Sequence, residues 1–419
     1  MDENLIITSP VKYLKKLFRQ SIEYAHPATL LRPYLPDITT KPVTIISAGK
    51  AAASLAKKFE DYWQGPISGI AVTPYGHGEN TQFVKVIEAS HPTPDKNSVL
   101  AAKEVFKLCS SLSPKDLVYV LLSGGGSSLL CFPEDNISLK DKQRMNVLLL
   151  KCGASIEEIN TVRKQISKIK GGKLLSHCNG AQIHTLAISD VFNDDPSIIA
   201  SGPSVPDRSS KEDVIKIINK YKLNIPKSID DWLNTKIHAL DKMNYSINKK
   251  NKYSIIASPE LMLKKIEKKI INDGYGCLNL GVLCEDSNLL GRQHARMSLA
   301  YKPDKPTIIL SGGETTVKVT GKGQGGRNSQ YLLCLAKELN GHPHIYALAA
   351  DTDGIDGVTD AAGAYYYPNA LKRLEKDAKN YLDANDSYSA FKEINTLIKT
   401  GPTKTNVNDF RAILIAPNN

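Results

Sequence analysis

Glycines and hydroxyl side chains gather in one short run of the sequence, which consists of Ser123, Gly124, Gly125, Gly126, Ser127 and Ser128. Three consecutive glycines let backbone N–H groups approach an anion without a Cβ in the way, and the apolar residues that follow can begin a helix whose N-terminus favours negative charge. A flexible turn is the structural alternative, but such a turn seldom needs three glycines and three hydroxyl groups. The run therefore predicts a phosphate-binding loop.

A second glycine-rich segment, residues 321–326, leads into Arg327. It matches G-x-G-x-x-G, but the dinucleotide fingerprint opens the first strand-turn-helix unit of a chain, and this segment does not. A mobile loop that ends in an arginine can instead close over anionic groups, because the planar guanidinium binds them in a bidentate way. We expect Gly325 and Gly326 to contact phosphate, and Arg327 to bind substrate and act in catalysis.

Two basic side chains occupy positions where a ligand can be reached. Lys50 follows an apolar run and directly precedes a helix start, Ala51–Leu55. Burying an unpaired lysine is costly, so a ligand-binding and catalytic role is favoured over an exposed lysine in a first helical turn. His91 lies between extended prolines on a predicted surface loop. It either contacts the substrate or fills the loop.

Carboxylates follow two other apolar runs. Asp351 and Asp353 form a pair, and Asp190 is a second acidic residue of this kind. A calcium loop is excluded because Ile355 occupies the fifth position and no glutamate closes the twelfth. Paired carboxylates suit magnesium, which is held by one or two of them together with substrate phosphates. We expect Asp351 and Asp353 to bind Mg²⁺, with Asp190 as the alternative ligand and candidate general base; helix or turn capping is the structural alternative.

Buried strands are predicted directly before most of these residues. The six predicted strands cover residues 43–46, 117–122, 185–188, 253–257, 307–310 and 346–350. Ligands of open parallel α/β sheets bind just beyond the carboxyl ends of the strands, so the exits read as one active site. The fifth strand leads into Gly312, Gly313 and Glu314, which repeat the turn after the second strand and are expected to help bind phosphate.

The length of 419 residues predicts two α/β domains, because single cores stop growing near about 250 to 300 residues. Helical patterns at 97–109 and 156–175 alternate with the first strands and predict a Rossmann-like parallel sheet in residues 1–245. Residues 246–419 are expected to form a smaller α/β domain, with the active site in the cleft between the two. The sequence leaves open whether the terminal segments of each domain pack on the other domain.

Composition excludes several classes of function. The seven cysteines lie far apart without a C-x-x-C pair, which favours reduced thiols over disulfides or zinc. The net charge of +11 owes much to a diffuse lysine run without stacking aromatics, so we read it as a solvated face and expect no nucleic acid. With an acidic start and no apolar run near about 18 residues, we expect neither signal peptide nor membrane anchor and a cytoplasmic enzyme.

The motifs together resemble the glycerate 2-kinase family, two-domain enzymes whose C-terminal part is called the MOFRL domain. They run in family order from about residue 45 to 365 and include the segments 47–52, 90–95, 122–128, 160–164, 170–174, 189–191, 194–197, 200–203, 310–316, 325–328 and 351–357. The resemblance implies an ATP- and magnesium-dependent kinase that forms 2-phosphoglycerate, with active-site roles for Lys50 and Arg327. Ser258-Pro259, where the family pattern has asparagine, is a departure that bears on one wall of the cleft.

Three hypotheses follow. The first is phosphoryl transfer from ATP to the 2-hydroxyl of D-glycerate, with small molecules as the only partners and a homodimer left open. The second is an NAD(P)-dependent hydroxypyruvate reductase, a label that many family members carry; its support is limited to Gly321, Gly323 and Gly326. The third is a non-catalytic protein that binds a nucleotide or sugar acid, which the lysine, arginine and aspartates disfavour.

Overall fold

The computed structural model describes residues 9–37, 40–235 and 250–417, which form two compact units. The N-terminal unit comprises residues 30–256, and the C-terminal unit comprises residues 1–29 and 257–419. The expected boundary at 245/246 lies outside the described residues. No helix in the described part of the chain is long and apolar enough to cross a membrane.

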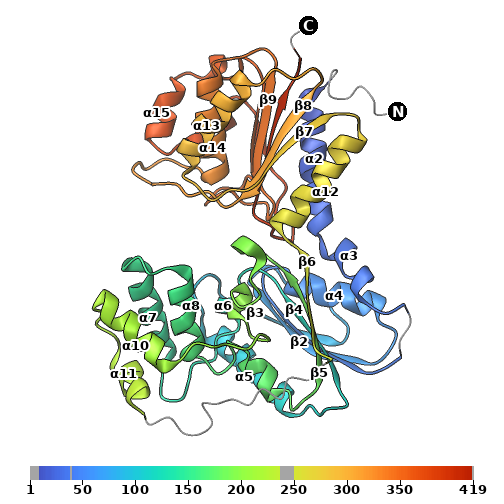
Figure 1. The fold of residues 1–419 in the computed structure, drawn as a ribbon, viewed down its shortest axis with the longest axis vertical. Helices are drawn as coiled ribbons and strands as arrows, with labels where there is room; N and C mark the ends of the chain where they lie inside the picture. Colours follow the sequence, from blue (N-terminus) through green and yellow to red (C-terminus); the bar gives the residue numbers. More distant parts are fainter. Residues whose placement is uncertain (1–8, 38–39, 236–249, 418–419) are drawn as a thin grey trace. The chain divides into compact units, whose positions relative to one another are not determined.

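The N-terminal unit is built on a six-stranded sheet in the order β3-β2-β1-β4-β5-β6 (Figure 1). Its strands are β1 (Val43–Ala48), β2 (Ile67–Pro74), β3 (Val84–Ala89), β4 (Leu117–Leu122), β5 (Gln182–Ile188) and β6 (Lys252–Ala257). The pairs from β3 through β5 are all parallel. The predicted parallel sheet is therefore confirmed. The strand predicted at 253–257 exists, but it closes this sheet as β6 instead of opening the second domain.

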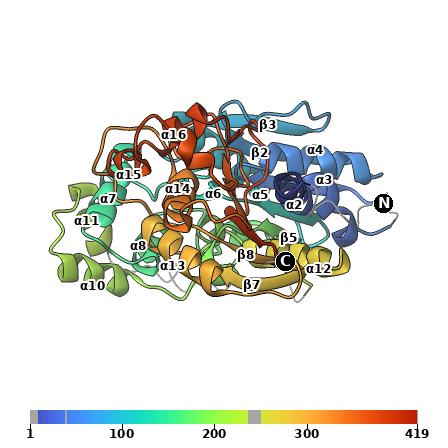
Figure 2. The ribbon, with the colours of Figure 1, turned by 90° about the horizontal axis from the view of Figure 1, so that it is seen from above.

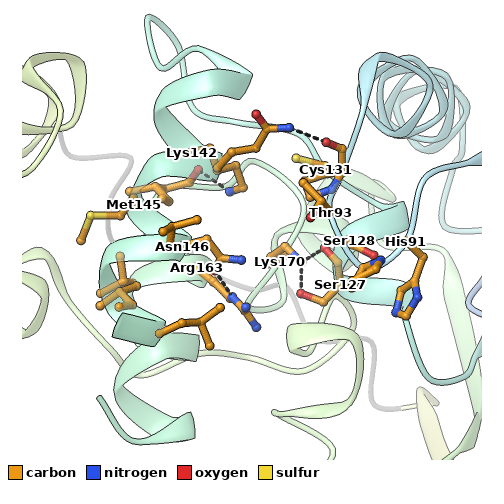
Figure 3. Close-up of a pocket in the computed structure, with 18 of the residues that line it drawn as sticks. His91, Thr93, Ser127, Ser128, Cys131, Lys142, Met145, Asn146, Arg163 and Lys170 are labelled. Atoms are coloured by element: carbon orange, nitrogen blue, oxygen red, sulfur yellow. Dashed lines mark hydrogen bonds between the residues drawn. The ribbon is translucent and has the colours of Figure 1, made fainter. Parts of the chain in front are cut away.

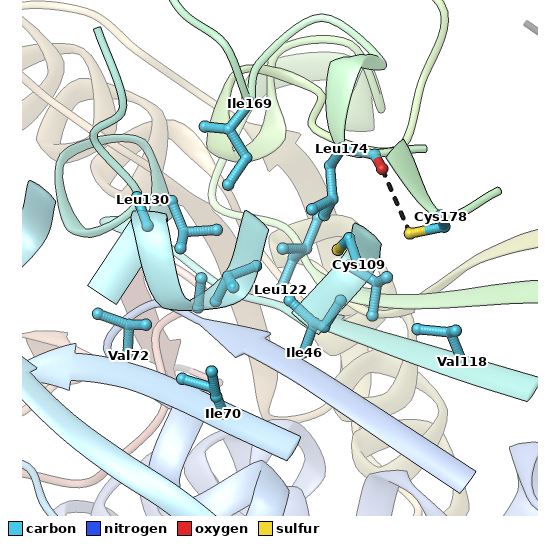
Figure 4. Close-up of a cluster of buried hydrophobic side chains, with 14 of the residues drawn as sticks. Ile46, Ile70, Val72, Cys109, Val118, Leu122, Leu130, Ile169, Leu174 and Cys178 are labelled. Atoms are coloured by element: carbon cyan, nitrogen blue, oxygen red, sulfur yellow. Dashed lines mark hydrogen bonds between the residues drawn. The ribbon is translucent and has the colours of Figure 1, made fainter. Parts of the chain in front are cut away.

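Helices cover both faces of this sheet, because alternate residues of the central strands point to opposite sides. Val118, Val120 and Leu122 pack into a core with residues of α5 (Lys96–Ser110), α6 (Gly126–Leu129) and α9 (Lys173–His177). Figure 4 shows Val118 and Leu122 in this core. Tyr119 points the other way, and its ring contacts Phe59 of α4 (Ala52–Tyr62) at 4.9 Å. The strands thus read as continuous apolar runs because both faces are buried.

A group of helices forms a second core at one end of this unit (Figures 1 and 2). It contains α7 (Leu139–Lys151), α8 (Ile156–Gln165), α10 (Lys211–Tyr221) and α11 (Lys227–Asn234). Four short helical elements also precede β6 in the sequence: α3 (Pro27–Leu30), η1 (Arg32–Tyr34), η2 (Phe192–Asp194) and η3 (Ile199–Ser201). The helix predicted over 156–175 is wrong in its second half. The helix ends at Gln165. The chain then turns back, and Ser167 forms an antiparallel β-bridge with Pro133.

The C-terminal unit holds a mixed six-stranded sheet in the order β11-β10-β9-β12-β8-β7. Its strands are β7 (Gly276–Val282), β8 (Thr307–Gly313), β9 (Ile345–Asp351), β10 (Gly363–Tyr366), β11 (Leu397–Ile398) and β12 (Asp409–Ile415). β12 is antiparallel to both β8 and β9, so those two run in the same direction and end at one edge of the sheet. The start of β12 lies at that same edge.

Both faces of this sheet are also covered. One face carries α13 (Ser287–Ala300) and α14 (Arg327–Leu339), which lie side by side, with η5 (Ala370–Arg373), α15 (Ala378–Asp383) and α16 (Ser387–Glu393) in the remaining space. The other face carries α2 (Pro10–Ala25) and α12 (Pro259–Asn272). Leu14, Leu17 and Phe18 of α2 are almost fully buried there, and the Phe18 ring lies 5.9 Å from that of Phe410. The first helix of the described residues therefore belongs to the C-terminal unit.

Candidate functional site

The exits of β1 and β4 interlock in the N-terminal unit. The Lys50 N–H donates to the carbonyl of Gly124 at 2.8 Å, and the Ala51 N–H donates to the Ser123 hydroxyl at 3.0 Å. Gly49, at φ 134°, is required here, because a Cβ would lie 2.1 Å from the Ser123 Oγ. The structure thus brings Lys50 beside the predicted phosphate-binding loop.

His91 reaches the same loop from the segment after β3. Gly125 has φ 85°, and a Cβ on it would lie 2.8 Å from the His91 imidazole. The glycine is therefore needed both for its backbone conformation and for the close approach of the ring. The structure places His91 beside the loop, and its contact with a substrate stays a prediction.

The loop's first helical residues are held by a polar cluster. The Ser127 hydroxyl lies 2.8 Å from the Ser201 hydroxyl, which donates to Asn160 at 3.1 Å. Lys170 donates from Nζ to the Ser127 Oγ at 2.6 Å and also to the Ser127 carbonyl. Ser201 adopts φ 61°, in the left-handed region that non-glycine residues rarely occupy. Such strain persists where the surroundings impose it, and it is concentrated at functional sites.

A cavity of about 340 Å³ opens beside this cluster (Figure 3). His91, Gly125, Ser127 and Ser128 line one side, and residues of α7 and α8 line the other. Lys142, Arg163 and Lys170 contribute three basic groups to its wall. Arg163 donates from Nε to Asn146 at 2.6 Å, and Lys142 donates to the Ile166 carbonyl at 3.0 Å. Burial, followed by repulsion from Lys142, holds the pKa of Lys170 well below its usual range.

Lys142 gives the stability of the ligand-free protein a defined pH dependence. Burial lowers the pKa of its ammonium group from 10.5 to about 8, so the fold disfavours the charged form. That penalty is complete below pH 8 and is lost as the pH rises towards 10.5. We expect Lys142→Met to raise the free energy of unfolding by about 2 kcal/mol at neutral pH, after the loss of its hydrogen bond is counted.

Urea denaturation of wild type and Lys142→Met at neutral and alkaline pH checks this expectation. The advantage of the variant should shrink through the window from about 8 to 10.5. A difference that stays constant across that window would contradict it.

Asp190 lies two residues beyond the end of β5, next to the fully buried Ser189. The segment that follows contains further residues in the left-handed region, Asn193, Asp194 and Ala200. Ala200 packs so closely that a Cβ on Gly126 would lie 2.8 Å from its methyl group. The exit of β5 is therefore attached to the exit of β4 in the same unit. The role of Asp190 as a base or metal ligand stays a prediction.

Arg327 is the centre of a charge cluster in the C-terminal unit. Its guanidinium donates to Asp409 at 2.8 Å through Nε, to Asp351 at 2.6 Å through Nη2, and to Glu314 through Nη1. The side chains of Asp409 and Asp351 are 0% and 5% exposed, whereas that of Glu314 is 52% exposed. Arg327 is the first residue of α14, so it does not end a free loop. Buried carboxylates fix its position.

An excess of acid surrounds this arginine. Burial, then repulsion by Asp353 and Asp409, raises the pKa of Asp351 well above its usual range, although Arg327 opposes the rise. The Asp351 oxygens accept from Arg327 and from the Asp353 N–H at 3.0 Å. This concentration of negative charge fits a divalent cation shared with substrate phosphates. Among the residues described, no three His, Cys, Asp or Glu side chains form a complete metal site.

The glycines of the 321–326 loop pack against the chain itself. The Gly321 and Gly323 N–H groups donate to Asn385 and Ala384 at 2.8 and 2.9 Å, and a Cβ on Gly323 would clash with Asp386. The N-terminus of α14 is capped by Asp356, which accepts from the N–H groups of Asn328 and Ser329 at 2.9 Å each.

The predicted mobile loop is therefore anchored. A Cβ on Gly326 would lie 2.3 Å from the Asp356 carboxyl carbon, which explains that glycine. Gly312 and Gly313 are the last residues of β8, paired with Phe410 and Asp409. Phosphate binding by Gly312, Gly313, Glu314, Gly325 and Gly326 stays a prediction, and a phosphate there has to compete with these internal bonds.

Several residues of these clusters were missed from the sequence. Asp409 begins a strand, whereas the rule for parallel sheets predicts active-site residues only where strands end. The antiparallel β12 brings its start to the edge where β8 and β9 end. Lys142 and Lys170 were missed because nothing in a single sequence distinguishes a buried lysine from an exposed one. The Lys-Gly-Gly turn at 170–172, both glycines at positive φ, was the available signal.

Comparison with known proteins gives matches along most of the chain. The model of a domain of unknown function, DUF4147, matches residues 13–234, and the MOFRL family model matches residues 307–409. A protein of Agrobacterium vitis that carries the provisional name hydroxypyruvate reductase is 41% identical over 96% of this chain and 94% of its own. The D-glycerate 2-kinase of Thermotoga maritima is 37% identical over 94% and 97%. The crystal structure of a glycerate kinase from Thermotoga maritima gives a TM-score of 0.88 at 35% identity, over 97% and 99%.

Proposed function

Because the chain belongs to the family in which a DUF4147 domain is joined to a MOFRL domain, we propose that it is a glycerate 2-kinase. It transfers the γ-phosphoryl group of ATP to the 2-hydroxyl of D-glycerate and releases 2-phospho-D-glycerate and ADP. The observation that carries the proposal is the match to a D-glycerate 2-kinase over nearly the whole of both chains. We place the reaction in the cytoplasm.

The residues supply what phosphoryl transfer requires, which is positioning and neutralisation of charge. The 2-hydroxyl oxygen forms the new bond to phosphorus as the bond to the departing ADP oxygen breaks, and the hydroxyl proton passes to a base, for which Asp190 is the candidate. Lys50 and Arg327 bind the glycerate carboxylate or the migrating phosphoryl group. The Ser123–Ser128 loop binds phosphate, with His91 against it as a substrate contact.

Mg²⁺ fits the acidic cluster around Asp351 and Asp353, where it would supply positive charge for the phosphates. We expect Asp351→Asn and Asp353→Asn each to raise the magnesium concentration for half-maximal rate, because each removes an anionic oxygen and conserves shape. Titration of the rate with magnesium checks this. Lower thermal stability with an unchanged magnesium requirement would assign the aspartates to the support of Arg327 and move the metal, most simply to Asp190.

The reductase alternative is disfavoured. Its support was the spacing of Gly321, Gly323 and Gly326, and the structure explains these glycines by close packing against residues 384–386 and Asp356. A pyrophosphate-binding turn is not needed to account for them. Because the Agrobacterium vitis relative carries the name hydroxypyruvate reductase, reduction of hydroxypyruvate should also be measured.

Two assays of the purified protein decide between the alternatives. Glycerate-dependent ADP release, measured with coupling enzymes and followed by NMR of the product, should give 2-phosphoglycerate. Steady oxidation of NADH with hydroxypyruvate, followed at ~340 nm, would overturn the kinase assignment. ATP binding without glycerate-dependent turnover would indicate a non-catalytic protein.

A further inference from the structure

The cavity of the N-terminal unit is lined by positive charge that the protein itself does not neutralise. Lys142 and Lys170 are 7% and 2% exposed, and burial lowers the pKa of the Arg163 guanidinium. Their hydrogen-bond partners are neutral: a backbone carbonyl, the Asn146 amide, and the Ser127 hydroxyl and carbonyl. In the described ranges, none of the three has a carboxylate within ion-pair distance.

This arrangement differs from that of neighbouring lysines. Lys164 pairs with Asp207 at 3.3 Å, and Lys173 pairs with Glu134 at 2.7 Å. Lys164 and Lys173 lie within three residues of Arg163 and Lys170, respectively. Carboxylates are therefore present in this region and form ion pairs with neighbouring lysines. Buried charges are normally paired, because taking an ion out of water costs several kcal/mol. Three unpaired cations around one cavity therefore indicate a site whose counter-charge comes from a ligand.

We propose that this cavity binds the nucleotide, with the phosphate groups of ATP against Lys170, Arg163 and the Ser127 hydroxyl. The assignment rests on the proposed kinase function and adds which residues bind the donor. A bound polyanion supplies the counter-charge that the three cations lack, and the charge-assisted bonds that it accepts are stronger than the neutral ones it replaces. Lys142, on helix α7, adds a third positive charge that attracts the phosphate groups.

The size and the lining of the cavity favour a nucleotide over glycerate. Its volume of about 340 Å³ falls in the range of pockets that enclose drug-sized ligands, and a three-carbon acid would fill little of it. The wall also contains the apolar side chains of Val147 and Leu150, which are 48% and 61% exposed. A cavity lined by both basic and apolar side chains suits a molecule that carries a flat base as well as phosphates.

Calorimetric titration of the full chain with separate parts of the ligand tests the assignment. The probes are ATP, tripolyphosphate, adenosine and D-glycerate, each in the presence of EDTA so that metal binding does not contribute. We expect Lys170→Met and Arg163→Met each to raise the Kd of ATP and of tripolyphosphate at least about tenfold. The Kd values of adenosine and D-glycerate should change less than about twofold.

Lys168→Met is the matched control, because it removes the same charge two residues from Lys170. Lys168 pairs with the exposed Asp135 and does not line the cavity. The Lys168→Met variant should therefore bind ATP with the Kd of wild type. Arg163→Lys keeps the charge, so its Kd for ATP should lie between those of wild type and Arg163→Met. If Lys170→Met does not fold, the two Arg163 variants decide the question.

Two results would overturn the assignment. Loss of D-glycerate affinity with ATP affinity retained would make the cavity the acceptor site, and unchanged affinity for every probe would make the cations structural. Failure of the proposed function gives a different result. A wild-type protein that binds ATP through these residues but releases no ADP with D-glycerate would refute the kinase and leave the nucleotide site intact.

Discussion

Lys50→Ala should lower kcat/KM for glycerate phosphorylation by at least about 100-fold and leave the melting temperature unchanged. A preorganised charge contact in a phosphoryl-transfer site is commonly worth about 3 kcal/mol or more. The Lys50 backbone is fixed by its bond to Gly124, and the substitution keeps that bond because it changes only the side chain. The fold should therefore survive the loss of the ammonium group.

The matched control for this variant is Lys57→Ala, which removes the same charge from the middle of α4. Steady-state kinetics and thermal melts of the two variants give the comparison. Near wild-type turnover of Lys50→Ala, with an unchanged melting temperature, would refute the role of Lys50. Equal losses in both variants would point to a general field of positive charge instead of a specific contact.

Arg327→Lys should lose most of its activity although the charge is retained. The guanidinium contacts Asp409, Asp351 and Glu314 through three different nitrogens, and a lysine has one. Asp409 and Asp351 are buried and hold the arginine, whereas the pair with the half-exposed Glu314 is weak enough for an anionic substrate to replace. We therefore expect glycerate-dependent ADP release to fall steeply while ATP binding by calorimetry stays within a few-fold.

The position of Arg327 at the start of α14 changes how this experiment is read. A first-turn arginine that only balanced buried acids would cost stability when replaced, and the folded enzyme would keep its kcat. Comparison of kcat, KM and melting temperature separates that case from direct substrate contact. Arg373→Lys, at an exposed arginine bonded to Tyr367, is the control for the exchange itself. Equal activity of Arg327→Lys and wild type would count directly against the proposed role.

The parts of the fold that depend on burial were predictable from sequence. The strands at 43–46 and 117–122 are apolar throughout because helices cover both faces of the sheet, and the capped helix at 97–109 has a regular pattern. The exit of β1 next to that of β4 followed from the topology of parallel sheets. These features are determined by local composition and by rules that apply to all such sheets.

The parts that depend on long-range packing were not predictable. The periodicity of 156–175 continues past Gln165, but the chain turns there because Ser167 and Lys168 donate to the Phe132 carbonyl and Lys170 reaches Ser127. Arg327 looked like the end of a mobile loop, since sequence alone does not show that residues 384–386 accept the loop's N–H groups. Asp409 became visible only when the antiparallel pairing of β12 was known.

The place of α2 has a consequence for how the polypeptide acquires its structure during synthesis. α2 precedes every other described helix and strand, yet it packs on β9 and β12, and β12 ends at Ile415. The side chains of Tyr13, Leu14 and Leu17 therefore cannot be buried there until translation has passed residue 415. The strands of the N-terminal unit all lie between Val43 and Ala257, so that unit can assemble while translation continues. The C-terminal unit closes a contact of very high sequence separation, which makes its folding late and slow.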